Sequence, residues 1–231
     1  MSQNKTNFAV PLAFVGMMFF AIGFALGINS FLIPVLKGAL SLPSGVAYLL
    51  LAATFVPFLI FGYPASATIA KIGYKRTMAL SFLIFAVAFI LFVLSAKLEN
   101  FILFLIASFV SGAANAYLQA SVNPYITILG PIESAAKRMS IMGICNKLAW
   151  PVAPLFFALV VADQTNVQTS DLYLPFYIII GVFLLLGIIS LMAPLPEVKA
   201  AGEDESDTAN CPYAANKTSI WQFPHLVLGA L

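Results

Sequence analysis

Four polar residues recur at every fourth position in one mainly apolar stretch of this chain. They are Ser111, Asn115, Gln119 and Asn123. A spacing of four residues places their side chains on one slowly drifting stripe of an α-helix. Three of the four are amides, and an amide can donate and accept hydrogen bonds at once. Such a stripe either lines a water-filled path or holds helices together, and four polar groups in register favour the path.

Another apolar stretch, near the N-terminus, carries polar residues close to a proline. Asn29 and Ser30 come just before Pro34, whose ring removes the helical hydrogen bond to the carbonyl of Ser30. Backbone that is freed at membrane depth is tolerated only where protein or water satisfies it. Gly23 and Gly27, in the same stretch, indicate a face on which another helix packs closely.

A charged residue also stands inside an apolar run. Lys147 follows Asn146 about eight residues into its run, or ~12 Å along a helix. Pro151 frees the carbonyl of Lys147 and Pro154 that of Trp150, so we expect a distorted helix beside the charge. An ionisable residue at such a place indicates a functional site in a transport path. The alternative is a lysine that snorkels to the interface and anchors the helix end.

These residues would be positioned by helices in a lipid bilayer. The 231 residues are 61% hydrophobic and only 9% charged, whereas soluble domains are about one quarter charged. Apolar stretches of roughly 20 residues are long enough to span a bilayer, and without water their backbones must be helical. The sequence predicts six spans, at about residues 8–36, 46–70, 77–96, 101–129, 139–162 and 172–193.

The loop charges predict the orientation. With the N-terminus in the cytoplasm, eight basic residues lie in inner segments and two, Lys37 and Lys97, in outer loops. The inner ones are Lys5, Lys71, Lys75, Arg76, Lys137, Arg138, Lys199 and Lys217. This bias follows the positive-inside rule. We expect a multi-pass membrane protein with a cytoplasmic N-terminus, with the lipid bilayer as its surroundings and no nucleic-acid partner.

The chain divides into three predicted segments. Residues 1–194 form the six-helix bundle, and the polar, acidic residues 195–218 form a cytoplasmic linker. The last segment, residues 219–231, reads "SIWQFPHLVLGAL" and is apolar but too short to cross a bilayer. We interpret it as the truncated start of a seventh span.

Enzymatic function is not expected. An intramembrane enzyme would need metal ligands or an acid/base pair at depth, and the only histidine is His225 in the final segment. The two cysteines, Cys145 and Cys211, provide no disulfide framework. No metal site and no cofactor are predicted.

The run "LQASVNPYITILGPIESAAKRMSIMGICNKLA" closely resembles the fourth and fifth spans of bacterial glucose/galactose transporters, in the fucose permease branch of the major facilitator superfamily. "INSFLIPVLKGAL" resembles the end of their first span, and "SIWQFPHLVLGAL" the opening of their seventh. The resemblance covers essentially the whole chain and about half of a twelve-span transporter.

The resemblance implies an N-terminal half made of two inverted three-span repeats, with the C-terminal six-helix half missing from this chain. It implies alternating access around a sugar site, in a transporter of the bacterial inner membrane. Asn29, Gln119, Asn123 and Asn146 match family motifs and would bind sugar hydroxyls, whereas Asn115 rests on the stripe alone. Trp150 and Tyr125 are candidates for stacking on the sugar or for ordinary packing. The cytoplasmic loop motif keeps Lys71, Gly73, Lys75 and Arg76, but has Ala70 where an Asp is common.

Two departures from the fucose permeases concern coupling. Those permeases carry an Asp and a Glu where this chain has Ser30 and Gln119. No carboxylate is left in the predicted spans to take up a proton near pH 7. The glucose/galactose branch resembles this chain at both positions and includes sodium-driven members, so the resemblance implies a sodium co-substrate or facilitated passage. A proton-coupled fucose or N-acetylglucosamine permease, and a non-transporting sensor with the same fold, remain the alternatives.

Overall fold

The computed structural model describes residues 9–161 and 168–193. Within these residues all regular structure is helical. The predicted linker, 195–218, and the predicted seventh-span start, 219–231, lie outside the described residues and stay predictions.

The long helices follow the predicted spans closely. They are α1 (Ala9–Ala39), α3 (Leu49–Leu98), α4 (Phe101–Ile128), α5 (Ala135–Val160) and α6 (Tyr173–Met192), joined by the short helices α2 (Ser44–Ala47), η1 (Ile132–Ser134) and η2 (Thr169–Leu172).

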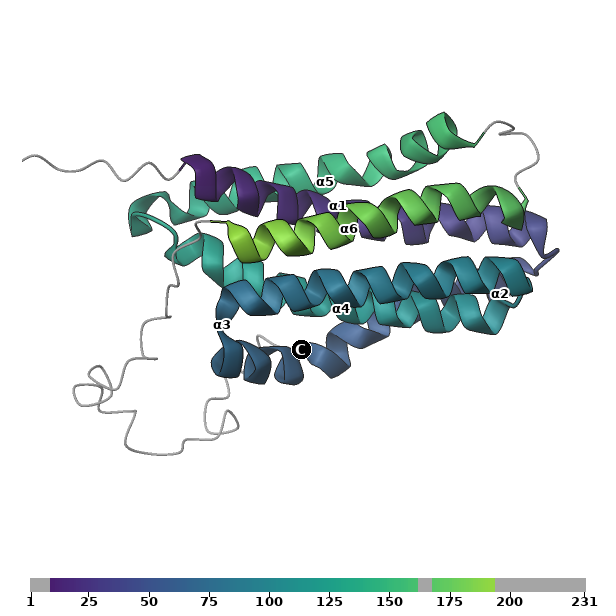
Figure 1. Cartoon of the computed structure of the whole chain (residues 1–231), viewed down its shortest axis with the longest axis horizontal. Helices are drawn as coiled ribbons and strands as arrows, with labels where there is room; N and C mark the ends of the chain where they lie inside the picture. The colour runs from purple at the N-terminus through teal and green to yellow at the C-terminus, as the bar shows by residue number, and fades with distance from the viewer. Residues whose placement is uncertain (1–8, 162–167, 194–231) are drawn as a thin grey trace, which may run out of the picture. The chain divides into compact units, whose positions relative to one another are not determined.

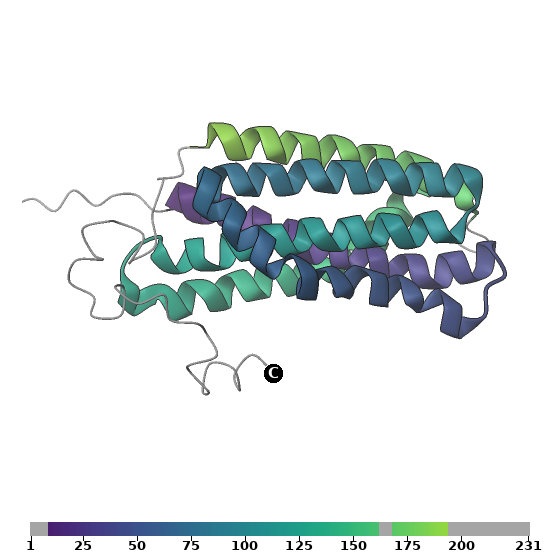
Figure 2. The ribbon, with the colours of Figure 1, turned by 90° about the horizontal axis from the view of Figure 1, so that it is seen from below.

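The six predicted spans correspond to five long apolar helical segments, because the two halves of α3 match the second and the third predicted span. At Gly73 the backbone leaves the helical conformation, with φ 82° and ψ 168°. The chain reverses there, so residues 49–72 and 74–98 form a hairpin (Figures 1 and 2). The expected loop at 71–76 is therefore a one-residue break, because a positive φ costs glycine little.

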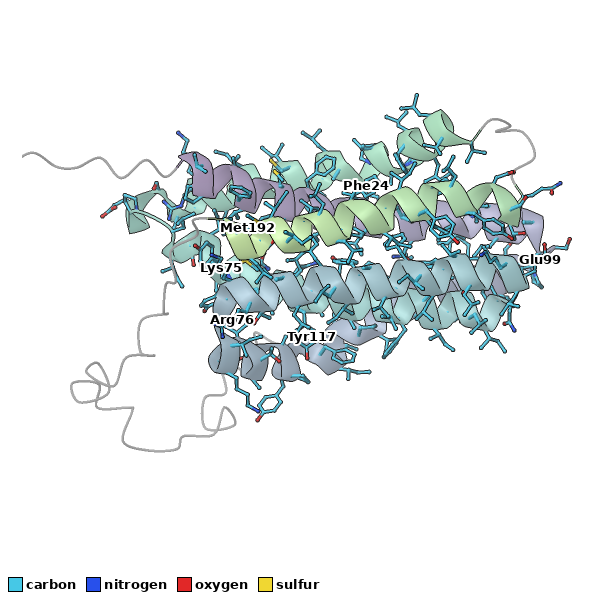
Figure 3. All side chains as sticks on the ribbon, in the orientation of Figure 1. Phe24, Lys75, Arg76, Glu99, Tyr117 and Met192 are labelled. Carbon is cyan, nitrogen blue, oxygen red and sulfur yellow. The ribbon has the colours of Figure 1, made fainter. Side chains whose placement is uncertain are left out.

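The helices alternate in direction, so the described connections gather at two ends of the bundle. Gly73 and the link between α4 and α5 lie at one end, here called the Gly73 end. The other, the Glu99 end, holds the links from α1 to α3 and from α3 to α4. Figure 3 shows Lys75 and Arg76 at the end opposite Glu99.

Local sequence signals fix these turns. Asn100 caps α4, its Oδ1 accepting from the amides of Ile102 and Leu103 at 2.9 and 3.4 Å. This satisfies amides that have no partner within the helix. At the other end of α4, Gly130 takes a φ of 104° and turns the chain toward α5.

The prolines do not interrupt their helices. α1 continues through Pro34 to Ala39, and α5 continues through Pro151 and Pro154 to Val160. A proline ring removes one helical hydrogen bond without ending a helix that its neighbours hold. The distortion expected beside Lys147 is thus not a break in the helix.

Two kinds of contact hold the bundle. Between the second half of α3 and α6, buried phenylalanines interlock; Phe85 and Phe183 stack with centroids 4.7 Å apart. Elsewhere glycines bring backbones together: a Cβ on Gly23 would lie 1.9 Å from the carbonyl oxygen of Asn146, and one on Gly27 would lie 2.6 Å from that of Trp150. The predicted packing role of Gly23 and Gly27 is confirmed, here between α1 and α5.

Candidate functional site

The polar stripe of α4 passes from the protein interior to its surface. Ser111 and Asn115 are wholly buried, whereas Gln119 and Asn123 are partly exposed. Ser121, two residues beyond Gln119, is buried and donates to the carbonyl of Tyr117 on its own helix. Gln119 and Asn123 are therefore the stripe residues whose amides can reach a ligand from outside this bundle in the described conformation.

Asn29 of α1 meets the stripe at its buried end. Its Nδ2 donates to the carbonyl of Ala25 at 3.1 Å and to Ser111 Oγ at 3.3 Å. Asn29 has no exposed surface, and its Oδ1 has no hydrogen-bond partner among the described residues. Asn115 shares this condition at both amide atoms. Neither amide can contact a sugar in this conformation, and their predicted role in sugar binding stays a prediction.

The adjacent Ser30 differs from Asn29. It is partly exposed, and its hydroxyl donates to the carbonyl of Leu26 at 3.1 Å on the same helix. The Ser30 hydroxyl is therefore accessible at the surface of the bundle, but it has no group that titrates near pH 7.

Asn146 lies where α5 crosses α1. Its Nδ2 donates to the carbonyl of Phe19 at 3.1 Å, across a contact made close by Gly23. The residue is partly exposed. Its amide nitrogen thus holds the helix pair, and its Oδ1 is the atom left to accept from a ligand.

Lys147 is exposed on α5, and its Nζ lies 5.1 Å from the centroid of the Trp150 ring. An ammonium over the face of an indole is stabilised by the ring quadrupole. Trp150, predicted as a candidate for stacking on a sugar, covers the lysine instead in this conformation. The sequence analysis missed this ring as a partner of Lys147, although the i, i+3 spacing of Lys147 and Trp150 signals it.

Tyr125 is the other aromatic candidate, and it is buried, with only 1% of its surface exposed. Its ring centroid lies 6.1 Å from that of Tyr74. In this conformation it packs within the bundle, as in the ordinary packing alternative.

Arg138 organises the link between α4 and α5, a role that sequence reasoning missed. Its guanidinium donates to the carbonyls of Ile126, Thr127 and Pro131 at 3.2, 3.1 and 2.8 Å, and to Ser134 Oγ. Only 9% of the residue is exposed. A cation at the last carbonyls of a helix satisfies free acceptors and complements the helix dipole. Arg138 therefore fixes the end of the helix that carries Gln119 and Asn123.

The predicted loop motif of Lys71, Gly73, Lys75 and Arg76 forms the hairpin of α3. Lys71 and Arg76 are exposed and Lys75 is partly exposed, on either side of Gly73 (Figure 3). Thr77 donates to the carbonyl of Gly73 at 2.7 Å and so closes the turn.

A cavity of about 790 Å³ opens at the Glu99 end, between α1 and α5. Its described walls include Phe31, Pro34, Pro154 and Glu99, and Glu99 accepts from the hydroxyl of Thr169 at 2.9 Å. None of the residues predicted to bind sugar is among these described walls.

Residues 14–230 match the sequence model of the Major Facilitator Superfamily. A glucose/galactose transporter of Brucella abortus is 32% identical over 235 aligned positions, which cover all of this chain and 55% of that protein. The L-fucose-proton symporter of Escherichia coli is 22% identical over 242 positions, covering 96% of this chain and 55% of the symporter. This chain thus spans about half the length of these relatives.

A crystal structure of the major facilitator superfamily transporter FucP in the outward conformation has the same fold. It matches with a TM-score of 0.70 at 22% identity, over 88% of this chain and 55% of the FucP chain. The five long apolar helices, the hairpin at Gly73 and the matched sequence agree. This chain belongs to the major facilitator superfamily, and its fold is that of one six-span half of such a transporter.

Proposed function

We propose that this chain is the N-terminal half of a sugar permease that takes up a glucose- or galactose-like hexose by alternating access. One observation carries the proposal: the amides of Gln119 and Asn123 emerge side by side at the partly exposed end of the α4 stripe. The identity to a glucose/galactose transporter along the whole chain supports a hexose as the substrate.

The chemistry of the exposed residues suits a neutral polyhydroxyl ligand. Gln119 and Asn123 come from α4, and each of their amides can match both the donor and the acceptor of a hydroxyl, while Asn146 of α5 adds its Oδ1 as an acceptor. None of the long helices α1, α3, α4, α5 and α6 carries an Asp or Glu. Recognition would therefore depend on neutral hydrogen bonds, with Lys147 as a charged neighbour on α5.

Sodium is proposed as the co-substrate in preference to protons. Ser30 and Gln119 stand where the resemblance places an Asp and a Glu in proton-coupled permeases, and neither side chain titrates near pH 7. The first three-span repeat and its inverted copy would rock against a second six-span half that this chain does not include.

The proposed setting is the bacterial inner membrane with the Gly73 end in the cytoplasm. Lys71, Lys75 and Arg76, together with Lys137 and Arg138 near the link from α4 to α5, all lie at that end. This distribution satisfies the positive-inside rule.

Uptake of labelled glucose by the complete transporter in proteoliposomes tests the proposal, with unlabelled glucose, galactose, fucose and N-acetylglucosamine as competitors. Competition by glucose and galactose but not by the other two is expected. Uptake of labelled fucose without uptake of labelled glucose would favour the second candidate, a fucose permease, to which the 22% identity with the Escherichia coli symporter gives weaker support. Binding without uptake of any of the four would favour a sensor.

A further inference from the structure

Lys147 stands near the middle of a membrane-spanning helix. It lies on the order of 18 Å along α5 from Ala135, about halfway to the other end of the helix. The other charged residues of the long helices lie within three residues of a helix end or of the break at Gly73. They are Lys37, Lys71, Lys75, Arg76, Lys97, Lys137 and Arg138. Lys147 is therefore the one charge that these helices hold at depth.

The ammonium of Lys147 has no acidic partner in the part of the chain that the structure describes. The carboxylates in that part, Glu99, Glu133 and Asp171, all lie beyond the ends of the long helices. What Lys147 does contact is the Trp150 ring, whose centroid is 5.1 Å from Nζ. The ring quadrupole stabilises a cation without neutralising it. The positive charge is thus left to act on a ligand that comes near.

The depth of Gln119 can be read along α1. Asn29 of α1 bonds to Ser111 of α4, and Gln119 follows Ser111 by two helical turns on the same stripe. The two helices run in opposite directions. Gln119 is therefore level with a point two turns before Asn29 on α1, near Ala21.

Contacts with α5 bracket the same level on a different face of α1. Asn146 donates to the carbonyl of Phe19 at 3.1 Å, and a Cβ on Gly23 would lie 1.9 Å from the carbonyl oxygen of Asn146. Asn146 is thus level with Gln119, and Lys147 is the next residue. The ammonium therefore belongs to the depth at which the proposed sugar site lies.

The side chain of Lys147 leaves α5 on the side away from α6. On the α6 side, Phe156 packs against Phe24 of α1 with ring centroids 5.7 Å apart, in an apolar groove that α6 also lines. Phe156 follows Lys147 by two and a half helical turns, so the two side chains point in opposite directions. Trp150, which lies under the ammonium, contacts α1, since a Cβ on Gly27 would lie 2.8 Å from its Cδ1. The charge is therefore held beside α1, on the side that α6 does not cover.

At this place the charge would act on a bound sugar. Axes of packed helices are roughly 8–10 Å apart, so a hexose between Gln119 and Asn146 would lie within about 10 Å of the ammonium. Two unit charges about 10 Å apart, at an effective dielectric constant of about 20–40, change an affinity roughly 4- to 15-fold. A neutral hexose would be little affected.

We propose that Lys147 makes the sugar site selective for charge. It favours a hexose that carries a carboxylate over glucose, and it disfavours a hexose that carries an ammonium group. The inference rests on the proposed hexose site at Gln119 and Asn146 and adds the classes of sugar that this site accepts and rejects. None of the long helices carries a carboxylate that would offset the preference.

Equilibrium displacement of labelled glucose from the purified, complete transporter tests this selection. Glucose, 6-amino-6-deoxyglucose and glucuronate differ at one carbon, which carries a hydroxyl, an ammonium or a carboxylate at about pH 6. Relative to glucose in the same variant, Lys147→Met should bind the amino sugar more tightly and the acid more weakly than the wild type does, each by roughly 4- to 15-fold. Taking glucose as the reference removes any general loss of affinity.

Two control variants accompany this measurement. Lys147→Arg keeps the charge and should keep the wild-type order of the three sugars. Lys97→Met removes a lysine at the Glu99 end and should keep that order as well. If Lys147→Met does not fold, Lys147→Gln replaces it as the neutral variant.

Three outcomes would overturn the selection. The sugar ratios could be equal in the wild type and in Lys147→Met, as expected if an acid elsewhere in the complete transporter pairs with Lys147. Lys97→Met could change the ratios as much as Lys147→Met does. Neither charged sugar could displace glucose from any variant, which would mean that contacts of the hydroxyl and not charge set the specificity. A wild-type protein that binds no labelled glucose would instead refute the hexose proposal itself, so the two failures stay distinguishable.

Discussion

The amide of Asn29 on α1 donates to the hydroxyl of Ser111 on α4 at 3.3 Å, while its own oxygen has no partner among the described residues. The contact ties the first helix of one three-span repeat to the first helix of the next, at the buried end of the α4 stripe. The amides of the α4 stripe differ in exposure along the helix. Asn115 is buried beside this contact, whereas Gln119 and Asn123 are partly exposed.

Gln119→Ala should weaken sugar binding by the complete transporter roughly 5- to 150-fold and leave membrane insertion unchanged. A sugar hydroxyl would lose its partner in a desolvated site, at a cost of about 1–3 kcal/mol. Isothermal calorimetry with the purified protein would measure the loss. Ser121→Ala, whose hydroxyl is bonded within α4, should bind normally. Wild-type affinity in Gln119→Ala would remove Gln119 from the sugar site.

Lys147→Met should lower uptake while expression stays at the wild-type level. The change keeps the stem over Trp150 but removes the charge and the cation–π contact at 5.1 Å. Lys97→Met is the control, because Lys97 also lies near aromatic rings but at the Glu99 end of the bundle. Its Nζ is 6.0 Å from the ring centroids of Tyr173 and Tyr177. Normal uptake and affinity in Lys147→Met would mean that the lysine only anchors the helix.

Gly23→Ala should destabilise the bundle by about 1–3 kcal/mol or more, because the new Cβ would lie 1.9 Å from the carbonyl oxygen of Asn146 and force α1 away from α5. Gly143→Ala is the matched control, since a Cβ there meets nothing within 4 Å. Thermal unfolding in detergent compares the two. Equal midpoints for both variants would contradict the close contact of α1 with α5.

The sequence predicts more of the fold than of the burial at the site. Apolar length alone placed α1, α4 and α6, and the fourfold spacing placed Asn115 and Gln119 on one face. It did not show that Asn115 is enclosed and Gln119 is not, because that depends on which part of α3 approaches Gly112. Arg138 was counted only as a loop charge, since its partners are backbone carbonyls, which have no sequence signature.

Arg138→Met should lower the stability of the complete transporter by about 1.5–3 kcal/mol, the usual value for hydrogen bonds to a charged group. Arg138→Lys should recover only part of this, because an ammonium cannot reproduce the fork of donors that reaches Ile126, Thr127 and Pro131. Unfolding midpoints measure both. Lys137→Met changes the exposed neighbour and should have little effect; an equal loss there would indicate that charge alone matters.

Uptake should not respond to an imposed pH gradient between about pH 6 and 8. Ser30 and Gln119 cannot titrate in this range, and none of the long helices α1, α3, α4, α5 and α6 contains a carboxylate. A pH-sensitive dye inside proteoliposomes would follow proton movement during uptake. Proton influx recorded together with the sugar would contradict sodium coupling or facilitated passage.

Protection of position 119 by sugar tests most directly whether the α4 stripe lines the sugar path. Gln119→Cys would be introduced into the complete transporter after Cys145 and Cys211 are changed to serine, and its reaction with a small, membrane-impermeant maleimide would be timed. Thr127→Cys, at the exposed end of the same helix, is the control. We predict that glucose or galactose slows labelling at position 119 and leaves position 127 unchanged. Labelling at position 119 that is equally fast with and without saturating sugar would contradict the assignment of this stripe to the sugar path.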